Sequence, residues 1–563
     1  MIISYTSLGE AFHHSLLAKT DHIGLLEVNR NQLTKKLSYQ DIFDQAVHTA
    51  KHLQHHHFKD GAHCGIIMSN QSLWNTSAIG VFFAGGVLVP LDYKLGPEEH
   101  IRLILHADLT MLIVEYPIWH RLMKSADFEK LSNIVVFVTE VPEGKDIKHA
   151  LHLESAASNF SFVMKPRQPE DIATIVYSSG TFGRPKGCML THANYLHQAQ
   201  ALAQLFPVGK EHTYFSFIPT NHAIDFMCGF FLPIMHGSKT IHQRTLRPEF
   251  IASTISEFRV THMALVPMLL KNLETKLKNQ LSSLSFFSKL FFRIMLFINQ
   301  TLTRSRPCYK LSRVLLFPIH KKFGNHLQYI FVGGAYTDPV MAKFFYDIGF
   351  SVAVGYGLTE AGTVITVNDL KPFRHDTVGK PLSITQLKIQ NPNDAQIGEI
   401  IAKGPTVMKG YYKDDELTSQ TIIDGWLQTG DLGYIDKGHL IFKGRRKNMI
   451  VTSGGKNIYP EDIEHYFQSL PFDDYCVLAG SFIWPEQTQH RDELFLVYYN
   501  EKKTIFNYAK AIEEINQLLP EYKRISYALN FTKEFPKTAT LKIKRPVLAE
   551  NIAQSEIVEM IKL

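Results

Sequence analysis

The loop at residues 178–187, SSGTFGRPKG, combines the residue types that bind polyphosphate. Its glycines let backbone N–H groups approach phosphate oxygens closely, its hydroxyls add donors, and Lys186 adds a positive charge. The apolar, β-branched run at residues 171–177 predicts a buried strand that leads into the loop. The residues predicted to bind phosphate are Ser178, Ser179, Gly180, Thr181, Gly183 and Lys186.

The spacing within this loop excludes the Walker geometry of nucleotide hydrolases. A Walker loop ends in Gly-Lys-Ser or Gly-Lys-Thr and opens a helix. Here Pro185 precedes Lys186, and Gly187 and Cys188 follow it. We therefore expect phosphate to be held in another geometry. A plain surface turn is the alternative for the loop taken alone, because glycine and serine are common in turns.

Six further motifs follow the loop and identify a family. Together with the loop they resemble, in the same order, the adenylate-forming superfamily of acyl-CoA synthetases, luciferases and peptide-synthetase adenylation domains. The resemblance covers nearly the whole chain and implies that ATP activates a carboxylate with release of pyrophosphate. The motifs are FIPTNH (217–222), VGGAY (332–336), GYGLTE (355–360), GWLQTGD (425–431), GRRKNMIVTSGGKNIYPEDIE (444–464) and PKTATLKIKR (536–545).

The resemblance assigns roles to single residues. Glu360 corresponds to the family's magnesium-holding glutamate, and magnesium prefers carboxylate, water and phosphate oxygens. Asp431 and Arg445 correspond to residues that hydrogen-bond the ribose. For Glu360 and Asp431 taken alone, the alternative is an ordinary turn carboxylate. For Arg445 and its neighbours, the alternative is a solvated or nucleic-acid-binding cluster, although the run is too short to form a nucleic-acid-binding surface. The other implied nucleotide contacts are Thr181, Gly334, Ala335, Tyr356, Gly357 and Thr359.

Lys542 resembles the catalytic lysine that bridges the substrate carboxylate and the α-phosphate. A lysine suits this task because it places a compact charge on a long stem. An exposed tail lysine beside Lys544 and Arg545 is the alternative. By the same resemblance, Thr181 and His222 are further catalytic residues.

The family's second half-reaction implies a domain movement. A small carboxy-terminal domain would rotate about a hinge at Lys447. The segment led by Gly454 and Gly455 would then replace Lys542 and open a path for the thiol of CoA.

Two positions depart from the family pattern. Phe182 stands where threonine is usual in the phosphate loop, and Leu541 stands where glycine commonly precedes the catalytic lysine. These departures favour one alternative, a non-catalytic protein that binds acyl nucleotides at a membrane. The presence of Glu360, Asp431, Arg445 and Lys542 favours an enzyme.

Composition and periodicity indicate the fold class. A chain of 563 residues with 45% hydrophobic residues and a net charge of +6 is expected to form two or more globular domains. Strand-like runs at residues 65–69, 87–92, 110–115 and 133–140 alternate with helical stretches. We expect a large multi-layered α/β amino-terminal domain, residues 1–446, and a small rotating α+β carboxy-terminal domain, residues 447–563.

The cellular compartment is inferred from what the sequence lacks. The five cysteines show neither close pairing nor metal-ligand spacing, which favours reduced thiols in the cytoplasm. The amino terminus does not read as a signal peptide, and no run of about 18 apolar residues predicts a membrane span.

The substrate is predicted from the segment after His222 and from an insertion. Ala223 stands where enzymes of the family that activate amino acids carry an aspartate, and Asp225 lies two residues off that register. An insertion at about 268–323, with the core FFSKLFFRIMLFI, resembles the extra helical region of long-chain acyl-CoA synthetases. We therefore expect a long-chain or medium-to-long-chain fatty acid:CoA ligase that uses ATP, Mg²⁺ and CoA. A fatty acyl-AMP ligase that loads an acyl carrier protein is the alternative.

The insertion also carries a charge bias that points to a membrane surface. Its aromatic residues are interleaved with basic ones, as in an interfacial helix, and each basic residue near an anionic surface contributes about 1 kcal/mol. We expect peripheral contact at the inner face of a membrane through residues 271–322. A helix pair that packs its aromatics on the main domain is the alternative. The segment contains a single acidic residue, Glu274. Its basic residues are Lys271, Lys276, Lys278, Lys289, Arg293, Arg304, Arg306, Lys310, Arg313, Lys321 and Lys322.

Overall fold

The chain forms two compact units. The first comprises Met1–Leu387 and Ala402–Leu427, and the second Lys388–Ile401 and Gln428–Leu563. The second unit thus includes residues 388–401 and 428–446, which lie on the amino-terminal side of the boundary predicted at 446. Rotation about Lys447 stays a prediction. The computed structural model describes residues 4–145, 147–155, 160–178, 185–304, 307–368, 370, 373–452, 457–486, 490, 493–501, 506–537, 543–554 and 559–563.

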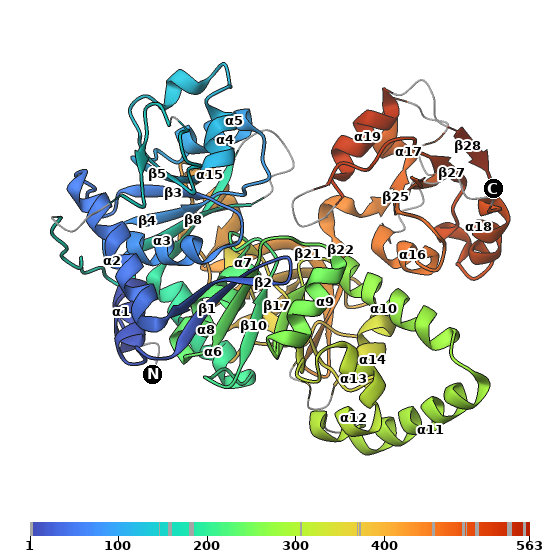
Figure 1. The fold of residues 1–563 in the computed structure, drawn as a ribbon. Helices are drawn as coiled ribbons and strands as arrows, with labels where there is room; N and C mark the ends of the chain where they lie inside the picture. Colours follow the sequence, from blue (N-terminus) through green and yellow to red (C-terminus); the bar gives the residue numbers. More distant parts are fainter. Residues whose placement is uncertain are drawn as a thin grey trace. The chain divides into compact units, whose positions relative to one another are not determined.

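An eight-stranded sheet in the first unit contains the strands predicted from the apolar runs. Neighbouring strands from β8 through β7 run parallel, whereas β9 is antiparallel to both β8 and β19. The predicted strands are therefore confirmed (Figure 1). The order is β19 (Gly410–Tyr411), β9 (Lys186–Thr191), β8 (Ile172–Ser178), β4 (Val87–Pro90), β3 (His63–Ile67), β5 (Met111–Glu115), β6 (Val135–Thr139) and β7 (Leu151–His152).

A nine-stranded sheet forms the second layer of strands in this unit. Its strands from β1 to β14 run parallel, so their carboxyl ends lie at one edge, where ligands bind in open α/β sheets. The order is β16 (Lys380–Pro381), β15 (Thr366–Val367), β14 (Ser351–Tyr356), β13 (Tyr329–Val332), β12 (His262–Leu265), β10 (Thr213–Ser216), β11 (Lys239–Gln243), β1 (Ile23–Asn29) and β2 (Gln32–Ser38).

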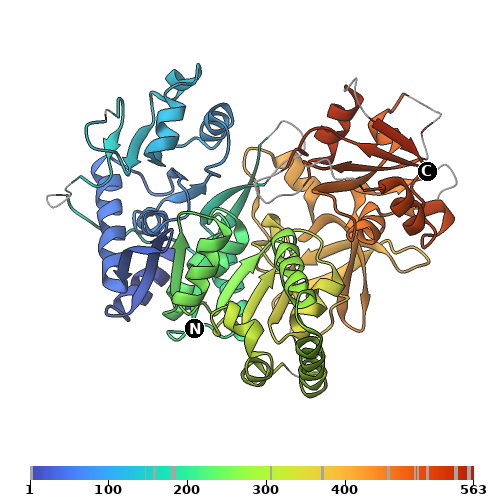
Figure 2. The same cartoon turned by 45° about the vertical axis from the view of Figure 1, so that its right-hand side comes forward.

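Helix α3 (Ser72–Phe83) lies between the two sheets. It contacts β1 of one sheet and β3 and β4 of the other, and nearly all of its side chains are buried. A helix that is apolar on all sides belongs in such a core. The multi-layered α/β architecture is thus confirmed (Figures 1 and 2). The other helices of these layers are α1 (Leu8–Leu17), α2 (Tyr39–His55), α4 (Pro97–His106), α5 (Tyr116–Leu122), α6 (His192–Leu205), α7 (Ala223–Asp225), α8 (Leu232–His236), α9 (Pro248–Glu257), α14 (Pro339–Asp347) and α15 (Asp415–Thr421).

The insertion is helical, as predicted. Helix α11 contacts both α12 and α14 and runs along an outer edge of the first unit (Figure 1). Among the described residues, no helix is long and apolar enough to cross a bilayer. The helices are α10 (Pro267–Ser282), α11 (Phe286–Thr303), α12 (Tyr309–Leu315) and α13 (Phe317–Lys322).

The second unit has the expected α+β character. Helices α16 (Pro460–Phe467) and α18 (Tyr508–Asn516) cover one face of a mixed four-stranded sheet, and α17 (Gly480–Ile483) and α19 (Arg545–Ala553) cover the other. The sheet contains β25 (Asp474–Ala479), β26 (Leu494–Tyr499), β27 (Tyr527–Asn530) and β28 (Glu559–Lys562).

A five-stranded sheet connects the two units through the chain. Its strands β17, β18 and β21 each cross the boundary between the units. The strands are β17 (Gln386–Gln390), β18 (Gly398–Lys403), β21 (Trp426–Asp436), β20 (Ile422–Ile423) and β22 (His439–Arg445).

Candidate functional site

The strands on either side of the phosphate loop, β8 and β9, pair antiparallel. Ser178 ends β8 and pairs with Lys186, the first residue of the antiparallel strand β9. A strand follows this loop where a Walker loop would be followed by a helix, which confirms that the Walker geometry is excluded. Outside the described residues lie Ser179, Gly180, Thr181, Phe182 and Gly183, together with the side chain of Ser178.

One tyrosine connects the phosphate loop to the predicted metal ligand. Glu360 lies in a short 3₁₀ turn, Thr359–Ala361, after β14, and its Oε1 accepts a hydrogen bond of 2.9 Å from Tyr411 Oη. Lys186 Nζ lies 5.9 Å from the centroid of the same ring. Burial and the Glu360 carboxylate raise the pKa of Tyr411, which keeps its hydroxyl protonated as a donor.

Sequence reasoning missed Tyr411. The residue reaches this position because β19 pairs with β9, with Tyr411 opposite Cys188. Nothing in the local pattern KGYYKD signals that pairing.

Glu360 fits a magnesium site in which phosphate oxygens and water supply the other ligands. It is half-buried, and its second carboxylate oxygen makes no hydrogen bond to any residue that the structure describes. Within that part of the chain, no group of three or more His, Cys, Asp or Glu side chains could enclose a metal. Magnesium usually binds one or two carboxylates together with substrate phosphates, so a single carboxylate suffices.

Small residues keep the ends of β13 and β14 open. Gly334 has a φ of +85° and is exposed with Ala335 just after β13. At Gly357, an added Cβ would lie 1.9 Å from the carbonyl oxygen of Thr363, so only glycine fits. Tyr356 is 9% exposed, which leaves little of its ring for stacking on adenine.

A buried glutamine holds the turn that follows Glu360. Gln198 on α6 donates from Nε2 to the carbonyl oxygens of Val364, at 2.9 Å, and Ala361, at 3.4 Å. Thr363 Oγ1 donates to the carbonyl oxygen of Ala223 at 3.2 Å. The turn that carries Glu360 is therefore fixed against the segment that carries His222.

His222 is positioned by the loop after β3. Its Nε2 lies 4.0 Å from Asp92 Oδ2. Asn70 donates to the carbonyl oxygen of Ile218 at 2.6 Å and accepts from the Thr220 backbone N–H at 2.9 Å. Asn70 thus holds both ends of the short segment before His222, a role that the sequence did not reveal.

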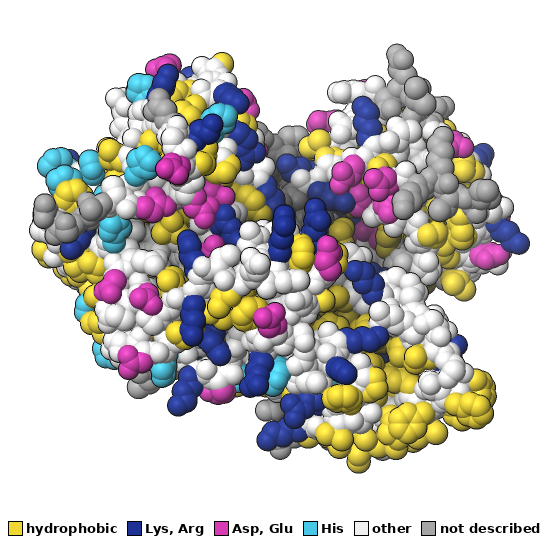
Figure 3. All heavy atoms as spheres, in the orientation of Figure 1, with side chains coloured by type: hydrophobic (Ala, Val, Ile, Leu, Met, Phe, Trp, Pro, Cys, Tyr) yellow, Lys and Arg dark blue, Asp and Glu magenta, His cyan; other side chains and the backbone are white. Residues whose placement is uncertain are grey.

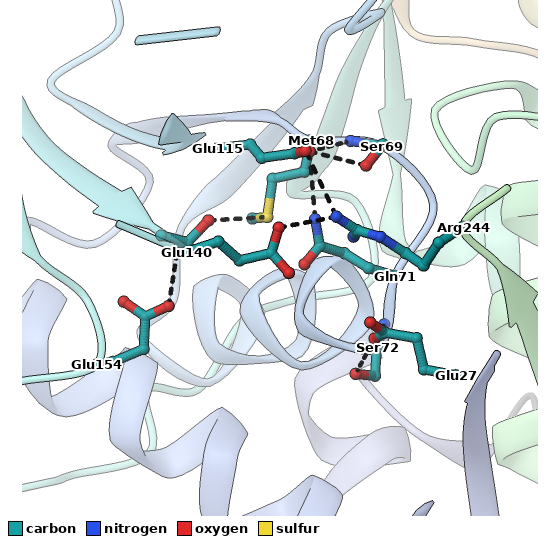
Figure 4. A network of polar contacts seen from close by, with 10 residues as sticks. Glu27, Met68, Ser69, Gln71, Ser72, Glu115, Glu140, Glu154 and Arg244 are labelled. Atoms are coloured by element: carbon teal, nitrogen blue, oxygen red, sulfur yellow. Dashed lines mark hydrogen bonds and ion pairs between the residues drawn. The ribbon is translucent and has the colours of Figure 1, made fainter. Parts of the chain in front are cut away.

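The same loop after β3 belongs to a partly buried ionic network (Figure 4). Arg244, which follows β11 of the nine-stranded sheet, lies 2.8 Å from Glu140 and 3.5 Å from Glu115 of the other sheet. Glu115 also accepts hydrogen bonds from Ser69 and Gln71, on either side of Asn70. The network therefore joins the carboxyl edges of both sheets and supports the loop that positions His222.

Asp225 is a structural residue. It is fully buried, and its Oδ2 accepts hydrogen bonds from Ser216, at 2.7 Å, and Thr220, at 3.0 Å. Burial raises the pKa of this carboxyl to about 7. A carboxyl engaged in this way does not present a charge to a substrate ammonium group.

We expect the stability of the protein to depend on Asp225 ionisation. Between pH 3.8 and about 7, the folded state holds a proton that the unfolded state has lost, so this contribution to stability falls as the pH rises. In Asp225→Asn, which stays neutral, that fall should be absent. Relative to this variant, wild type should lose up to about 1.4 kcal/mol per pH unit in the free energy of unfolding. Denaturant titrations at intervals from pH 5 to pH 7 measure the difference.

The exposed Asp44→Asn is the matched control and should follow wild type at every pH. A constant offset between wild type and Asp225→Asn would show that Asp225 is ionised throughout.

In the second unit, the predicted ribose contacts lie side by side. Asp431 and Arg445 pair across β21 and β22, with Arg445 Nε 3.4 Å from Asp431 Oδ1. Asp431 is 2% exposed. Arg446 is paired with Glu399 at 2.5 Å. Lys447 lies in the next turn, Arg446–Asn448.

Two predicted functional loops of this unit lie outside the described residues. Gly454 and Gly455 fall between β23 (Ile450–Val451) and β24 (Asn457–Ile458), which pair as a hairpin. Lys542 falls with Leu541 in the loop that begins after Lys537 and ends at Ile543, and those two flanking residues pair.

Arg545 is not part of an exposed tail. Its guanidinium lies 2.8 Å from Glu464 on α16 and is largely buried, while Lys544 is exposed. The ion pair fixes the start of α19, so Arg545 gives no support to the alternative that Lys542 is an exposed tail lysine; the role of Lys542 stays a prediction.

Comparison with known proteins places the chain in a family. Residues 18–412 match the AMP-binding enzyme family. The chain is 27% identical over 471 residues to a probable chloroplastic acyl-activating enzyme 16 of Arabidopsis thaliana, covering 71% of this chain and 65% of that protein. It is 27% identical over 482 residues to long-chain-fatty-acid–CoA ligase 6 of Rattus norvegicus, covering 79% and 68%. A chloroplastic long-chain-fatty-acid–acyl-carrier-protein ligase of Arabidopsis thaliana is 25% identical over 521 residues, covering 79% and 71%. The chain thus spans about two thirds of the length of these relatives.

Solved structures share the fold. ATP-bound MatB from Rhodopseudomonas palustris has a TM-score of 0.76 at 20% identity, covering 97% of this chain and 99% of MatB. The o-succinylbenzoate CoA synthetase from Bacillus subtilis, in complex with ATP and magnesium ion, has a TM-score of 0.73 at 20% identity, covering 96% and 99%. With this fold and a family match over most of its length, the chain belongs to the AMP-binding enzyme family.

Proposed function

We propose that this protein is an ATP-dependent fatty acid:CoA ligase. In the first step, a carboxylate oxygen of the fatty acid attacks the α-phosphorus of ATP, and the bond to the pyrophosphate leaving group breaks. In the second step, the thiol sulfur of CoA attacks the acyl carbon, and AMP leaves. The products are acyl-CoA, AMP and pyrophosphate.

The observation that carries this proposal is the link from Lys186 through Tyr411 to Glu360. It connects the phosphate loop to a carboxylate at the carboxyl edge of the nine-stranded sheet. Site residues at that edge include Gly334 and His222, so a nucleotide and a carboxylate substrate would meet there.

The remaining nucleotide contacts are proposed from the resemblance of the motifs to those of the family. Glu360 would hold Mg²⁺, which when bound neutralises phosphate charge. Asp431 and Arg445 would bind the ribose. Lys542 would stabilise the charge that develops between the carboxylate and the α-phosphate.

The fatty acid assignment rests on an apolar cluster beside His222. Tyr214, Ile218, Ala264 and Val266 are buried together, and Ile224 packs against them. Gly333, just after β13, lies close to Ile224, since an added Cβ would lie 3.3 Å from Ile224 Cδ1. An apolar wall favours an alkyl chain, and Asp225 is engaged elsewhere, which disfavours an amino acid. The relatives named as long-chain-fatty-acid ligases support the same class.

The thiol acceptor has two candidates. We favour CoA, because the insertion at residues 268–323 resembles that of the CoA ligases. An acyl carrier protein is the second candidate, supported by the relative that is named for it. We further propose a cytoplasmic location, with peripheral contact at the inner face of a membrane through residues 271–322, where fatty acid could be taken from the bilayer.

The proposal is tested by pyrophosphate release over carboxylates from acetate to oleate, with and without CoA. We expect release to rise with chain length and to turn over continuously only with CoA. An acyl carrier protein supplied in place of CoA should not sustain turnover.

Turnover with the carrier protein and not with CoA would assign the alternative ligase. Absence of pyrophosphate release with every carboxylate, despite ATP binding, would favour the non-catalytic protein.

A further inference from the structure

Helix α11 is apolar on two faces. Its inner face packs Phe292, Met295 and Leu296 against the core beside the nine-stranded sheet. Asn299 on this face donates a 2.9 Å hydrogen bond to the carbonyl oxygen of Asp347 at the end of α14. The helix is therefore anchored to the unit by one face, and its other face needs a separate explanation.

The opposite face forms a row of exposed apolar side chains, here called the outer ridge. Spacings of three and four residues place its members on one side of the helix. Figure 3 shows hydrophobic side chains gathered over α11 at the lower right, with lysine and arginine side chains beside them. The outer ridge comprises Phe287 (80% exposed), Leu290 (48%), Phe291 (63%), Ile294 (47%) and Phe297 (69%).

The sequence left two alternatives for the aromatic residues of this helix, contact with a membrane and packing on the main domain, and its two faces differ in this respect. Phe292 packs on the main domain, as that alternative predicts. Phe287 and Phe291 do not, because they point outward. Val314 and Phe317, on the neighbouring helices α12 and α13, are also 71% and 48% exposed. Exposed large apolar side chains gathered on one face of a globular protein mark an interaction site.

The charge around the outer ridge is positive. Residues 271–322 contain eleven basic residues and one acid, Glu274. That acid is buried and held between Lys271, at 3.0 Å, and Lys278, at 2.6 Å, so its charge is already neutralised. Arg293 is exposed on α11, and Lys289 is half-buried there.

We propose that the outer ridge inserts into the interface of a bilayer that contains anionic lipids. An apolar face flanked by basic residues suits this environment. The acyl chains accept the aromatic side chains, and the anionic headgroups attract the basic ones. Helix α11 would lie in the plane of the interface. This inference goes beyond the proposed reaction and does not depend on it.

The test is co-sedimentation of the full chain with vesicles of phosphatidylcholine alone, or of equimolar phosphatidylcholine and phosphatidylglycerol, at low and high salt. We expect binding to the anionic vesicles only, weakened by salt. The double variant Phe287→Ser, Phe291→Ser should lower the partition coefficient at least tenfold. The double variant Lys289→Glu, Arg293→Glu should lower it by a similar factor and remove its salt dependence.

Matched controls come from exposed residues elsewhere. Val163→Ser with Leu518→Ser removes side chains that are 60% and 70% exposed, and Lys510→Glu with Lys533→Glu makes the same charge change as the basic double variant. Both control variants should bind like wild type. Thermal melting of every variant shows that the fold is retained.

A second measurement reports insertion directly. In Phe291→Trp, the new indole should shift its emission to the blue on anionic vesicles and be quenched by brominated acyl chains. The four native tryptophans lie outside α11 and serve as the background.

Two results would overturn the proposal. One is vesicle binding that ignores salt and the Phe287→Ser, Phe291→Ser substitutions. The other is a dimer in solution that these substitutions dissociate, without vesicle binding by wild type, which would assign the outer ridge to a second copy of the chain.

Discussion

Replacing Lys542 with alanine is expected to stop adenylation while leaving thioester formation from pre-made acyl-adenylate largely intact. Lys542 would act only in the first step, where it stabilises charge between the carboxylate and the α-phosphate. Loss of one such contact costs about 10²- to 10³-fold in rate. Pyrophosphate release measures the first half-reaction, and acyl-CoA formation from synthetic acyl-AMP measures the second.

Lys544→Ala is the matched control for this experiment. Lys544 is exposed, lies two residues along the chain, and its backbone N–H donates to the Pro536 carbonyl oxygen at 2.7 Å, a bond that alanine keeps. Both half-reactions of this variant should run at the wild-type rate. Equal losses in the two half-reactions of Lys542→Ala would contradict the role assigned to Lys542.

Replacing Glu360 with glutamine is expected to lower the rate of adenylation by about 10²-fold or more and to raise the Mg²⁺ concentration needed for half-maximal rate. The amide keeps the shape and an acceptor for Tyr411 Oη, 2.9 Å away in wild type, but removes the charge that a magnesium ion requires. Pyrophosphate release over a Mg²⁺ titration measures both effects.

Tyr411→Phe should give a smaller defect of the same kind in the rate and in the Mg²⁺ requirement. Removing the hydroxyl takes away a hydrogen bond to Glu360 but leaves its carboxylate charged. Residues that hydrogen-bond to metal ligands contribute about 10-fold or more to metal affinity. Glu416→Gln, an exposed glutamate on α15, is the matched control. If Glu360→Gln and Tyr411→Phe both left the Mg²⁺ requirement unchanged, Glu360 would not be the metal ligand.

Local sequence patterns predicted the elements of the fold well. The strand-like runs predicted between residues 65 and 140 became parallel strands of one sheet. These predictions succeed because side-chain periodicity and β-branching act over a few residues. The exclusion of a Walker loop also succeeded, since the sequence around Lys186 lacks the Gly-Lys-Ser or Gly-Lys-Thr ending and the strand β9 begins there.

The positioning residues of the site were not predicted, because each acts at long range. Tyr411 reaches Glu360 across 51 positions, and Gln198 reaches Val364 across 166. Arg244 and Glu140 are 104 positions apart. A tyrosine, a glutamine or an arginine has no local pattern that reveals such a partner.

The amino-acid sequence by itself determined the family, the order of the motifs and the alternation of strands and helices, since these depend on residue identity and short-range periodicity. Only the tertiary structure decided which side chains are buried and what they contact. It buried Asp225 among hydroxyls, paired Arg545 with Glu464, and turned Phe287 outward while Phe292 faces the core. The physical reason is that desolvation and hydrogen bonding depend on neighbours brought together by the packing of distant segments.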